Sequence, residues 1–266
     1  MTWLKIILIG FLTTVFRIIG QMLIPARSQD VLLPSVFVEN GTLPIVFLAY
    51  GTFAYGVIAA MFLLIRYRVP GHRITQGLKY GISCCIVWVV YLLEPLAHAA
   101  PIDRITYPII DGIALLILGA LTGALLGTDY KKAKNTSAKR VDYIVIGAIT
   151  VTFTAGRLLQ YLVFGTYSMF IGKIAETLIW VIAAGLVISG VISWLRMYVP
   201  KRGRWFNAVV LGTILFGADL ALFNFFVPLV LSVDILDLIV RTVIDTAAVT
   251  IGCLIIQNED SAKVAG

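Results

Sequence analysis

The sequence predicts an all-α integral membrane protein in which eight transmembrane helices form two parallel four-helix repeats. Composition is the first observation behind this prediction: 60% of the 266 residues are hydrophobic, 13% are charged, and the mean hydropathy is +0.97. A soluble core of this length does not need so much apolar material. The other two observations are the lengths of the apolar stretches and an internal duplication.

Each apolar stretch is long enough to cross the hydrocarbon core as a helix, which takes roughly twenty residues. The runs are continuous rather than alternating, which favours helices over strands. The last stretch is the weakest candidate, because Asp237, Arg241 and Asp245 lie in its first half. The predicted spans are residues 3–24, 43–65, 77–99, 107–128, 143–164, 170–195, 206–231 and 235–256.

The duplication is clearest beside the apolar stretches. The segment RYRVP at 66–70 returns as RMYVP at 196–200, and Asp103 and Asp111 return with the same spacing as Asp237 and Asp245. Similarity at a period near half the chain length indicates a repeated unit. It predicts a first repeat at residues 1–128, a basic cytoplasmic linker at 129–142, a second repeat at 143–257 and a mobile tail at 258–266.

The loops predict the orientation of the spans. Basic residues gather in the loops after the second, fourth and sixth spans, at 66–79, 131–140 and 196–204, whereas the intervening loops are neutral or acidic. Basic loops stay on the cytoplasmic side. An even number of spans then leaves both termini in the cytoplasm, in a multi-pass protein of the plasma membrane. Because each half has four spans, the repeats are expected to be related by an axis along the membrane normal.

Ionisable residues inside the predicted spans are the main functional signal, because each is costly to place in a bilayer. Seven fall in the outer half of the bilayer and one, Asp219, falls near its middle. Such a one-sided group predicts a polar, hydrated pocket that is open toward the outside. The candidates for a ligand or ion pathway are Arg17, Glu94, Asp111, Arg157, Glu176, Asp219, Arg241 and Asp245.

The duplication predicts two ion pairs at equivalent heights, Arg17 with Asp111 and Arg157 with Asp245. Buried ion pairs are weak evidence for stability, so two roles stay open for them: holding helices together, or serving a ligand. Gln160 follows Arg157 by about one helical turn and is expected to orient it.

Charged residues that have no equivalent in the other repeat are better candidates for a functional role than residues that the repeats share. Glu94 has Val227 at the equivalent position, and Asp219 has no carboxylate counterpart. A carboxylate in apolar surroundings holds its proton more tightly than one in water. We therefore expect Glu94 and Asp219 to handle protons or cations, and Arg17 and Arg157 to hold an anionic group.

The sequence lacks the motifs of common catalytic and cofactor sites: a phosphate-binding glycine loop, a Ser-His-Asp or Cys-His set, or a zinc cluster. Cys84, Cys85 and Cys253 lie in apolar runs, where packing accounts for them. No catalytic residue, cofactor or metal ligand is therefore predicted. The net charge of +7 is concentrated in short loops beside apolar stretches, so nucleic acid is not a predicted partner.

These features favour a transporter for a small charged or zwitterionic solute or a lipid headgroup, with its site between the repeats. The alternative is a non-transporting receptor, immunity factor or complex subunit that binds a ligand or a partner helix. An outer-leaflet lipid-modifying enzyme that uses membrane carboxylates is a weaker alternative, and the sequence leans against an enzyme. The expected partners are membrane lipids and a small molecule or ion; a homo-oligomer or a larger complex is compatible with the sequence.

Overall fold

The computed structural model describes residues 2–24, 31–99, 102–128, 143–200 and 202–254. In these ranges the protein is helical, and the extended contact between Pro34 and Leu231 is an isolated β-bridge. The predicted linker at 129–142 and the predicted tail at 258–266 lie outside the described residues.

Seven helices in the described ranges are long and apolar enough to cross a membrane. Some of them continue from an α-helix into a short 3₁₀ or π segment. In chain order they are α1 (Thr2–Met22), α3 (Leu43–Met61) with η1 (Phe62–Leu64), α4 (Arg73–Leu92), α5 (Asp103–Leu126), α6 (Tyr143–Leu159) with η2 (Gln160–Phe164), α7 (Ile174–Leu195) with η3 (Arg196–Tyr198), and the series α8 (Arg204–Ala208), η4 (Val209–Ala218), α9 (Asp219–Asn224) and α10 (Val227–Val230).

The eighth predicted span corresponds to α11 (Ile235–Cys253), which has 19 residues. Three charged residues on this helix, Asp237, Arg241 and Asp245, set it apart from the seven more apolar helices. A further short helix, α2 (Val36–Glu39), lies between α1 and α3.

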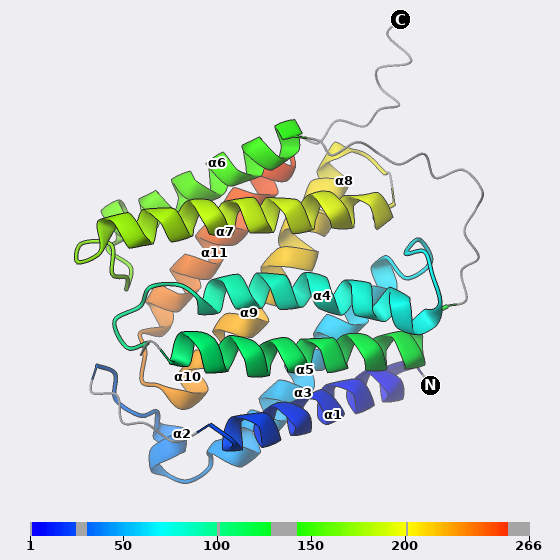
Figure 1. The fold of residues 1–266 in the computed structure, drawn as a ribbon, viewed down its shortest axis with the longest axis horizontal. Helices are drawn as coiled ribbons and strands as arrows, with labels where there is room; N and C mark the ends of the chain where they lie inside the picture. Colours follow the sequence, from blue (N-terminus) through cyan, green and yellow to red (C-terminus); the bar gives the residue numbers. More distant parts are fainter. Residues whose placement is uncertain (1, 25–30, 100–101, 129–142, 201, 255–266) are drawn as a thin grey trace, which may run out of the picture.

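The helices form two layers (Figure 1). In the nearer layer the order across the view is α1, α5, α4, α7 and α6, and each neighbouring pair is in contact. Behind it run α3, the series from α8 to α10, and α11. The helices α1 and α6 begin at the same end of the bundle, which is also the end where α8 begins (Figure 1).

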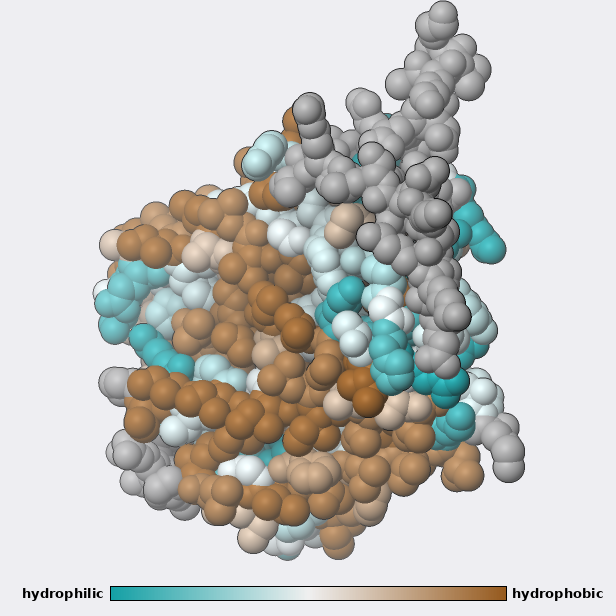
Figure 2. Space-filling model, turned by 45° about the vertical axis from the view of Figure 1, so that its right-hand side comes forward, coloured by the Kyte–Doolittle hydropathy of each residue, from teal (hydrophilic) through white to brown (hydrophobic). Residues whose placement is uncertain are grey.

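Apolar side chains face outward along the spans, as contact with lipid requires. Ile45, Val151 and Ile179 are each about two thirds exposed or more, although they lie within spans. Figure 2 shows hydrophobic residues over the middle of one face and hydrophilic residues gathered toward its ends. Burying such a surface in hydrocarbon avoids the large exposed apolar patches that soluble monomers rarely carry.

Small residues bring α4 and α5 into close contact. A Cβ atom added to Gly77 would collide with the carbonyl oxygen of Gly119, and one added to Gly81 would lie 2.7 Å from the Cα atom of Gly119. Without side chains at these positions the two backbones approach closely, as small residues at membrane helix interfaces allow. This contact fixes the position of α4, the helix that precedes Glu94.

The end of α4 differs from the predicted span in a way that matters for the site. The helix ends at Leu92, so Glu94 lies in the turn that follows it rather than within a span at 77–99. Pro95 explains this difference, because a proline disfavours helical geometry at the residue before it. Glu94 therefore lies in non-helical backbone.

Candidate functional site

The first buried ion pair joins α1 to α5. Arg17 donates from Nε to Oδ1 of Asp111 at 2.7 Å and from Nη2 to Oδ2 at 2.6 Å. This two-point contact is the strongest geometry available to an arginine and a carboxylate. Both residues are buried, at 5% and 1% exposure. The structure thus confirms the pairing of Arg17 with Asp111.

Aromatic rings surround the guanidinium of Arg17. Its Cζ atom lies 4.0 Å from the ring centroid of Phe226, 5.3 Å from that of Phe47 and 5.6 Å from that of Trp88. Cation–π attraction at these distances compensates part of the hydration that the cation loses on burial. Phe226 belongs to the second half of the chain, so this cluster also joins the two halves.

The second ion pair joins α6 to α11. Nη2 of Arg157 lies 2.7 Å from Oδ2 of Asp245, which also accepts a hydrogen bond from the Tyr91 hydroxyl at 2.9 Å. The other carboxylate oxygen accepts from Nε2 of Gln160 at 2.7 Å. The pairing of Arg157 with Asp245 is confirmed, whereas Gln160 binds the carboxylate rather than orienting the arginine. The Arg157 guanidinium lies over the ring of Trp180, at 4.9 Å.

Glu94 extends this second pair into a network. Its Oε1 atom accepts from Nη1 of Arg157 at 3.1 Å, and its Oε2 atom accepts from Nη2 of Arg241 at 2.6 Å. The hydroxyl of Tyr161 lies 3.4 Å from Oε1. Glu94 comes from the first half of the chain and both arginines come from the second half. One carboxylate therefore links the two halves of the protein.

Asp219 occupies a different environment. It is buried at 2% exposure, and its Oδ1 atom accepts a hydrogen bond from the Trp88 indole at 3.1 Å. Within the described residues no basic group lies close enough to form a salt bridge with it. Trp88 thus connects Asp219 to the aromatic cluster around Arg17.

Glu176 lies apart from the other candidates. It is in the first turn of α7, its side chain is 57% exposed, and it pairs with Lys173 at 3.3 Å. The structure therefore brings together seven of the eight predicted residues in two neighbouring buried groups. The first group contains Arg17, Asp111 and, through Trp88, Asp219; the second contains Glu94, Arg157, Arg241 and Asp245.

The burial of these groups differs from the hydrated, outward-open pocket that the sequence predicts. Glu94, Arg157 and Asp245 are at most 3% exposed, while the Arg241 side chain is 12% exposed. The physical reason is charge pairing: each guanidinium has a carboxylate at hydrogen-bonding distance. Nη1 of Arg17 and Nε of Arg157 are buried without a hydrogen-bond partner among the described residues. This conformation of the site is closed.

Two π-helical segments adjoin the site. The segment η2 begins at Gln160, three residues after Arg157, and η4 ends at Ala218, immediately before Asp219. π-helical turns are rare and are frequently found at functional sites. Both lie in the second half, whereas α1 and α4 of the first half are described as uninterrupted α-helices. No sequence pattern predicted them.

The aromatic members of the site were also missed at the level of sequence. Trp88, Tyr91 and Glu94 follow one another at intervals of three residues, which places them on one side of the end of α4. This spacing was the available signal. In the structure, α4 and the turn that follows it present an indole, a phenol and a carboxylate to Asp219, Asp245 and Arg157 of the other half.

His98, in the segment after α4, contacts Tyr167, in the segment between η2 and α7. Nδ1 of His98 lies 3.1 Å from the Tyr167 hydroxyl, and the two rings stack at 5.7 Å. The backbone N–H of Tyr167 donates to Asp237 at 2.9 Å. Burial, aided by the positive charge of Arg241, lowers the pKa of His98 below its usual value. His98 is therefore favoured in its neutral form.

The described residues contain no group of three or more histidine, cysteine, aspartate or glutamate side chains placed to hold a metal ion. The site can exchange charged partners. Arg157 and Arg241 both bind the carboxylate of Glu94, and a negatively charged group of a ligand could bind the two arginines in its place. Together, the apolar helices and the buried charges indicate a multi-pass membrane protein. No protein-family model, curated protein or solved structure matches the chain.

Proposed function

We propose that the protein is a plasma-membrane transporter for a small charged or zwitterionic solute or a lipid headgroup. In this proposal α11 is the eighth span, both termini are cytoplasmic, and the repeats at 1–128 and 143–257 move relative to each other. The proposed repeats are supported by equivalent helices that pack against equivalent neighbours in the two halves. The helix α1 packs on α3 and α5 and α4 packs on α5, while α6 packs on α7 and α11 and η4 packs on α11.

The observation that carries the proposal is the position of Glu94 between Arg157 and Arg241. Removing one partner from a buried ion pair costs about 3–5 kcal/mol, because the remaining charge is left without compensation. The halves therefore separate readily only when another anionic group takes the place of Glu94 on the arginines. A carboxylate or phosphate of the solute fits this requirement.

A zwitterionic solute satisfies both sides of the opened link. Its anionic group binds Arg157 and Arg241, and its cationic group binds the released Glu94. This exchange couples movement of the repeats to loading of the site, as alternating access requires. Asp219, which has no basic partner among the described residues, supplies a second carboxyl group for proton or cation coupling.

Charge movement across proteoliposomes tests the proposal. The purified protein is exposed on a solid-supported membrane to concentration jumps of phosphate, glutamate, glycine betaine, phosphocholine and phosphoethanolamine. We expect saturable currents with at least one solute, their loss in Glu94→Gln, and their persistence in Glu176→Gln. Equal currents in Glu94→Gln and the unaltered protein would contradict the proposal.

A non-transporting receptor, immunity factor or complex subunit is the second candidate. The closed geometry favours it, because Arg17 with Asp111 and Arg157 with Asp245 tie α1 to α5 and α6 to α11 without any ligand. Saturable binding of a solute without any flux would support this candidate over transport.

A further inference from the structure

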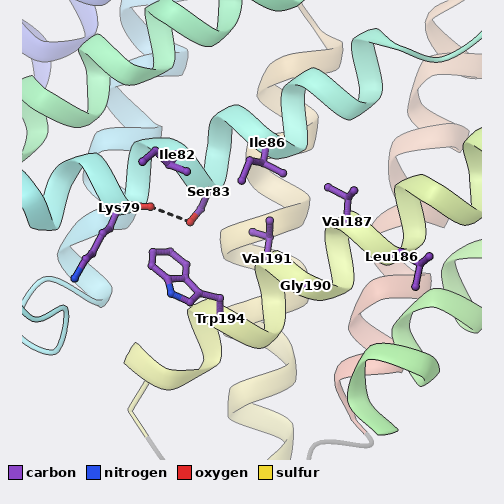
Figure 3. A pocket seen from close by; sticks show the side chains of 9 residues that line it. All are labelled: Lys79, Ile82, Ser83, Ile86, Leu186, Val187, Gly190, Val191 and Trp194. Carbon is purple, nitrogen blue, oxygen red and sulfur yellow. Dashed lines mark hydrogen bonds between the residues drawn. The ribbon is translucent and has the colours of Figure 1, made fainter. Parts of the chain in front are cut away.

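A groove between α4 and α7 lies away from the charged network, on the surface of the bundle, where its lining residues Ile82, Ile86 and Leu186 are exposed. Its volume is about 440 Å³, within the range of sites for small ligands. Ile86, Val187 and Val191 line its length, and Lys79 and Trp194 lie together at one end (Figure 3). The groove therefore has an apolar lining, with a cation and an indole at one end.

The depth of the groove matches one leaflet of a bilayer. Lys79 lies six residues after Arg73, the first residue of α4, or about 9 Å along the helix axis. Ile86 is seven residues further, or about 10 Å. Half of the hydrocarbon core is about 15 Å thick. Measured from Arg73, Ile86 thus lies about 20 Å along the axis, slightly past the middle of the bilayer. The Lys79 ammonium reaches back to the headgroup level, because it donates to the carbonyl oxygen of Pro70, which precedes the helix.

The polar end is built to meet an anion at the interface. The Lys79 ammonium donates to the carbonyl oxygen of Pro70 at 2.9 Å, and no carboxylate lies within salt-bridge distance of it among the described residues. Trp194 is the next-to-last residue of α7, the depth at which tryptophan is favoured in membranes. A phosphate group on the lipid would supply the missing negative charge.

We propose that this groove binds an anionic phospholipid of the leaflet that faces the basic loops. One acyl chain lies along the apolar lining between α4 and α7, and the phosphate contacts the Lys79 ammonium. A partner transmembrane helix is a poorer fit, because it would need a contact surface through both leaflets. The inference stands independently of transport, since the groove shares no residue with the charged network.

The chain offers matched variants for a test. Lys79→Gln removes the charge with little change in length. Lys5→Gln is its control, because Lys5 also lies near the basic end and donates to a backbone carbonyl, that of Leu125, at 3.1 Å. Gly190→Leu fills the groove, and no atom lies within 4 Å of a Cβ built there.

Native mass spectrometry of the full chain, purified in detergent and titrated with phosphatidylglycerol or phosphatidylcholine, measures the preference. A single lysine near the bilayer surface contributes roughly fivefold to binding of an anionic lipid. We expect the protein to prefer phosphatidylglycerol, Lys79→Gln to lose roughly fivefold of this preference, and Lys5→Gln to keep it. Gly190→Leu is expected to lower the number of retained lipids of both kinds.

Three outcomes would overturn the proposal: a preference unchanged by Lys79→Gln, an equal loss in Lys5→Gln, or two protein chains bound to each other with no retained phosphatidylglycerol. The last outcome would identify the groove as an interface between two copies. Elution of each folded variant as a single species by gel filtration keeps loss of folding separate from loss of lipid.

Discussion

Replacing Glu94 with glutamine tests the link between the halves most simply. The substitution keeps the shape of the side chain and removes its charge. Arg157 retains Asp245 at 2.7 Å, but Arg241, whose side chain is only 12% exposed, loses the carboxylate that lies 2.6 Å from it. Because one buried guanidinium keeps its partner, we expect a cost at the lower end of the range for broken buried pairs, about 3 kcal/mol.

Thermal unfolding of the purified protein measures this cost. For chains of this size about 3 kcal/mol corresponds to a fall in Tm of roughly 6–12 °C. Glu176→Gln is the matched control, because its carboxylate pairs with Lys173 in an exposed position and such pairs contribute little. If Glu94→Gln and Glu176→Gln shift Tm by the same small amount, Glu94 does not stabilise the contact between the halves.

Three further predictions concern single sites. Asp111→Asn is expected to lower the free energy of unfolding by about 3–5 kcal/mol because it leaves Arg17 buried without a countercharge, whereas Asp219→Asn, which breaks no ion pair, is expected to change it by less than about 1 kcal/mol; equal Tm shifts would contradict this. Gly77→Val is expected to abolish the monodisperse gel-filtration peak, because its side chain would enter the α5 backbone, while Gly147→Val, at an open position, keeps it. The lowered pKa of His98 means that the unfolded chain binds the proton more readily, so its contribution to stability is present above about pH 6.5 and is lost as pH falls through the folded pKa; His98→Asn is expected to flatten the fall of Tm below that pH, and an unchanged slope would refute the assignment.

The long-range pairing of Arg17 with Asp111 and of Arg157 with Asp245 could be predicted from the sequence. A charge inside a bilayer is costly unless it pairs with an opposite charge at a similar depth. The duplication places an arginine and an aspartate at equivalent depths in each half, so few other partners are possible. The same reasoning predicted the helical class and most span positions. It placed Glu176 among the pathway residues because counting residues along a span cannot show that α7 begins only at Ile174.

The closed state of the site could not be predicted in this way. Burial of Glu94 depends on how α4, α6 and α11 meet, which is a property of packing rather than of the hydropathy of any one stretch. The rings around the two arginines and the π-helical segments η2 and η4 are likewise set by contacts between helices. The hydropathy pattern of one helix does not predict which aromatic ring of a neighbouring helix will contact its arginine.

The accessibility of Tyr161 tests the central claim most directly, because its hydroxyl lies 3.4 Å from Glu94 in the closed site. In a background with Cys84, Cys85 and Cys253 changed to serine, Tyr161→Cys is labelled in proteoliposomes with a membrane-impermeant maleimide. Glu176→Cys, at an exposed position, gives the rate of unhindered labelling. The account predicts slow labelling at Tyr161→Cys that accelerates several-fold when a transported solute is added. Complete protection with every solute, while Glu176→Cys reacts fully, would show that the network does not open and would contradict transport.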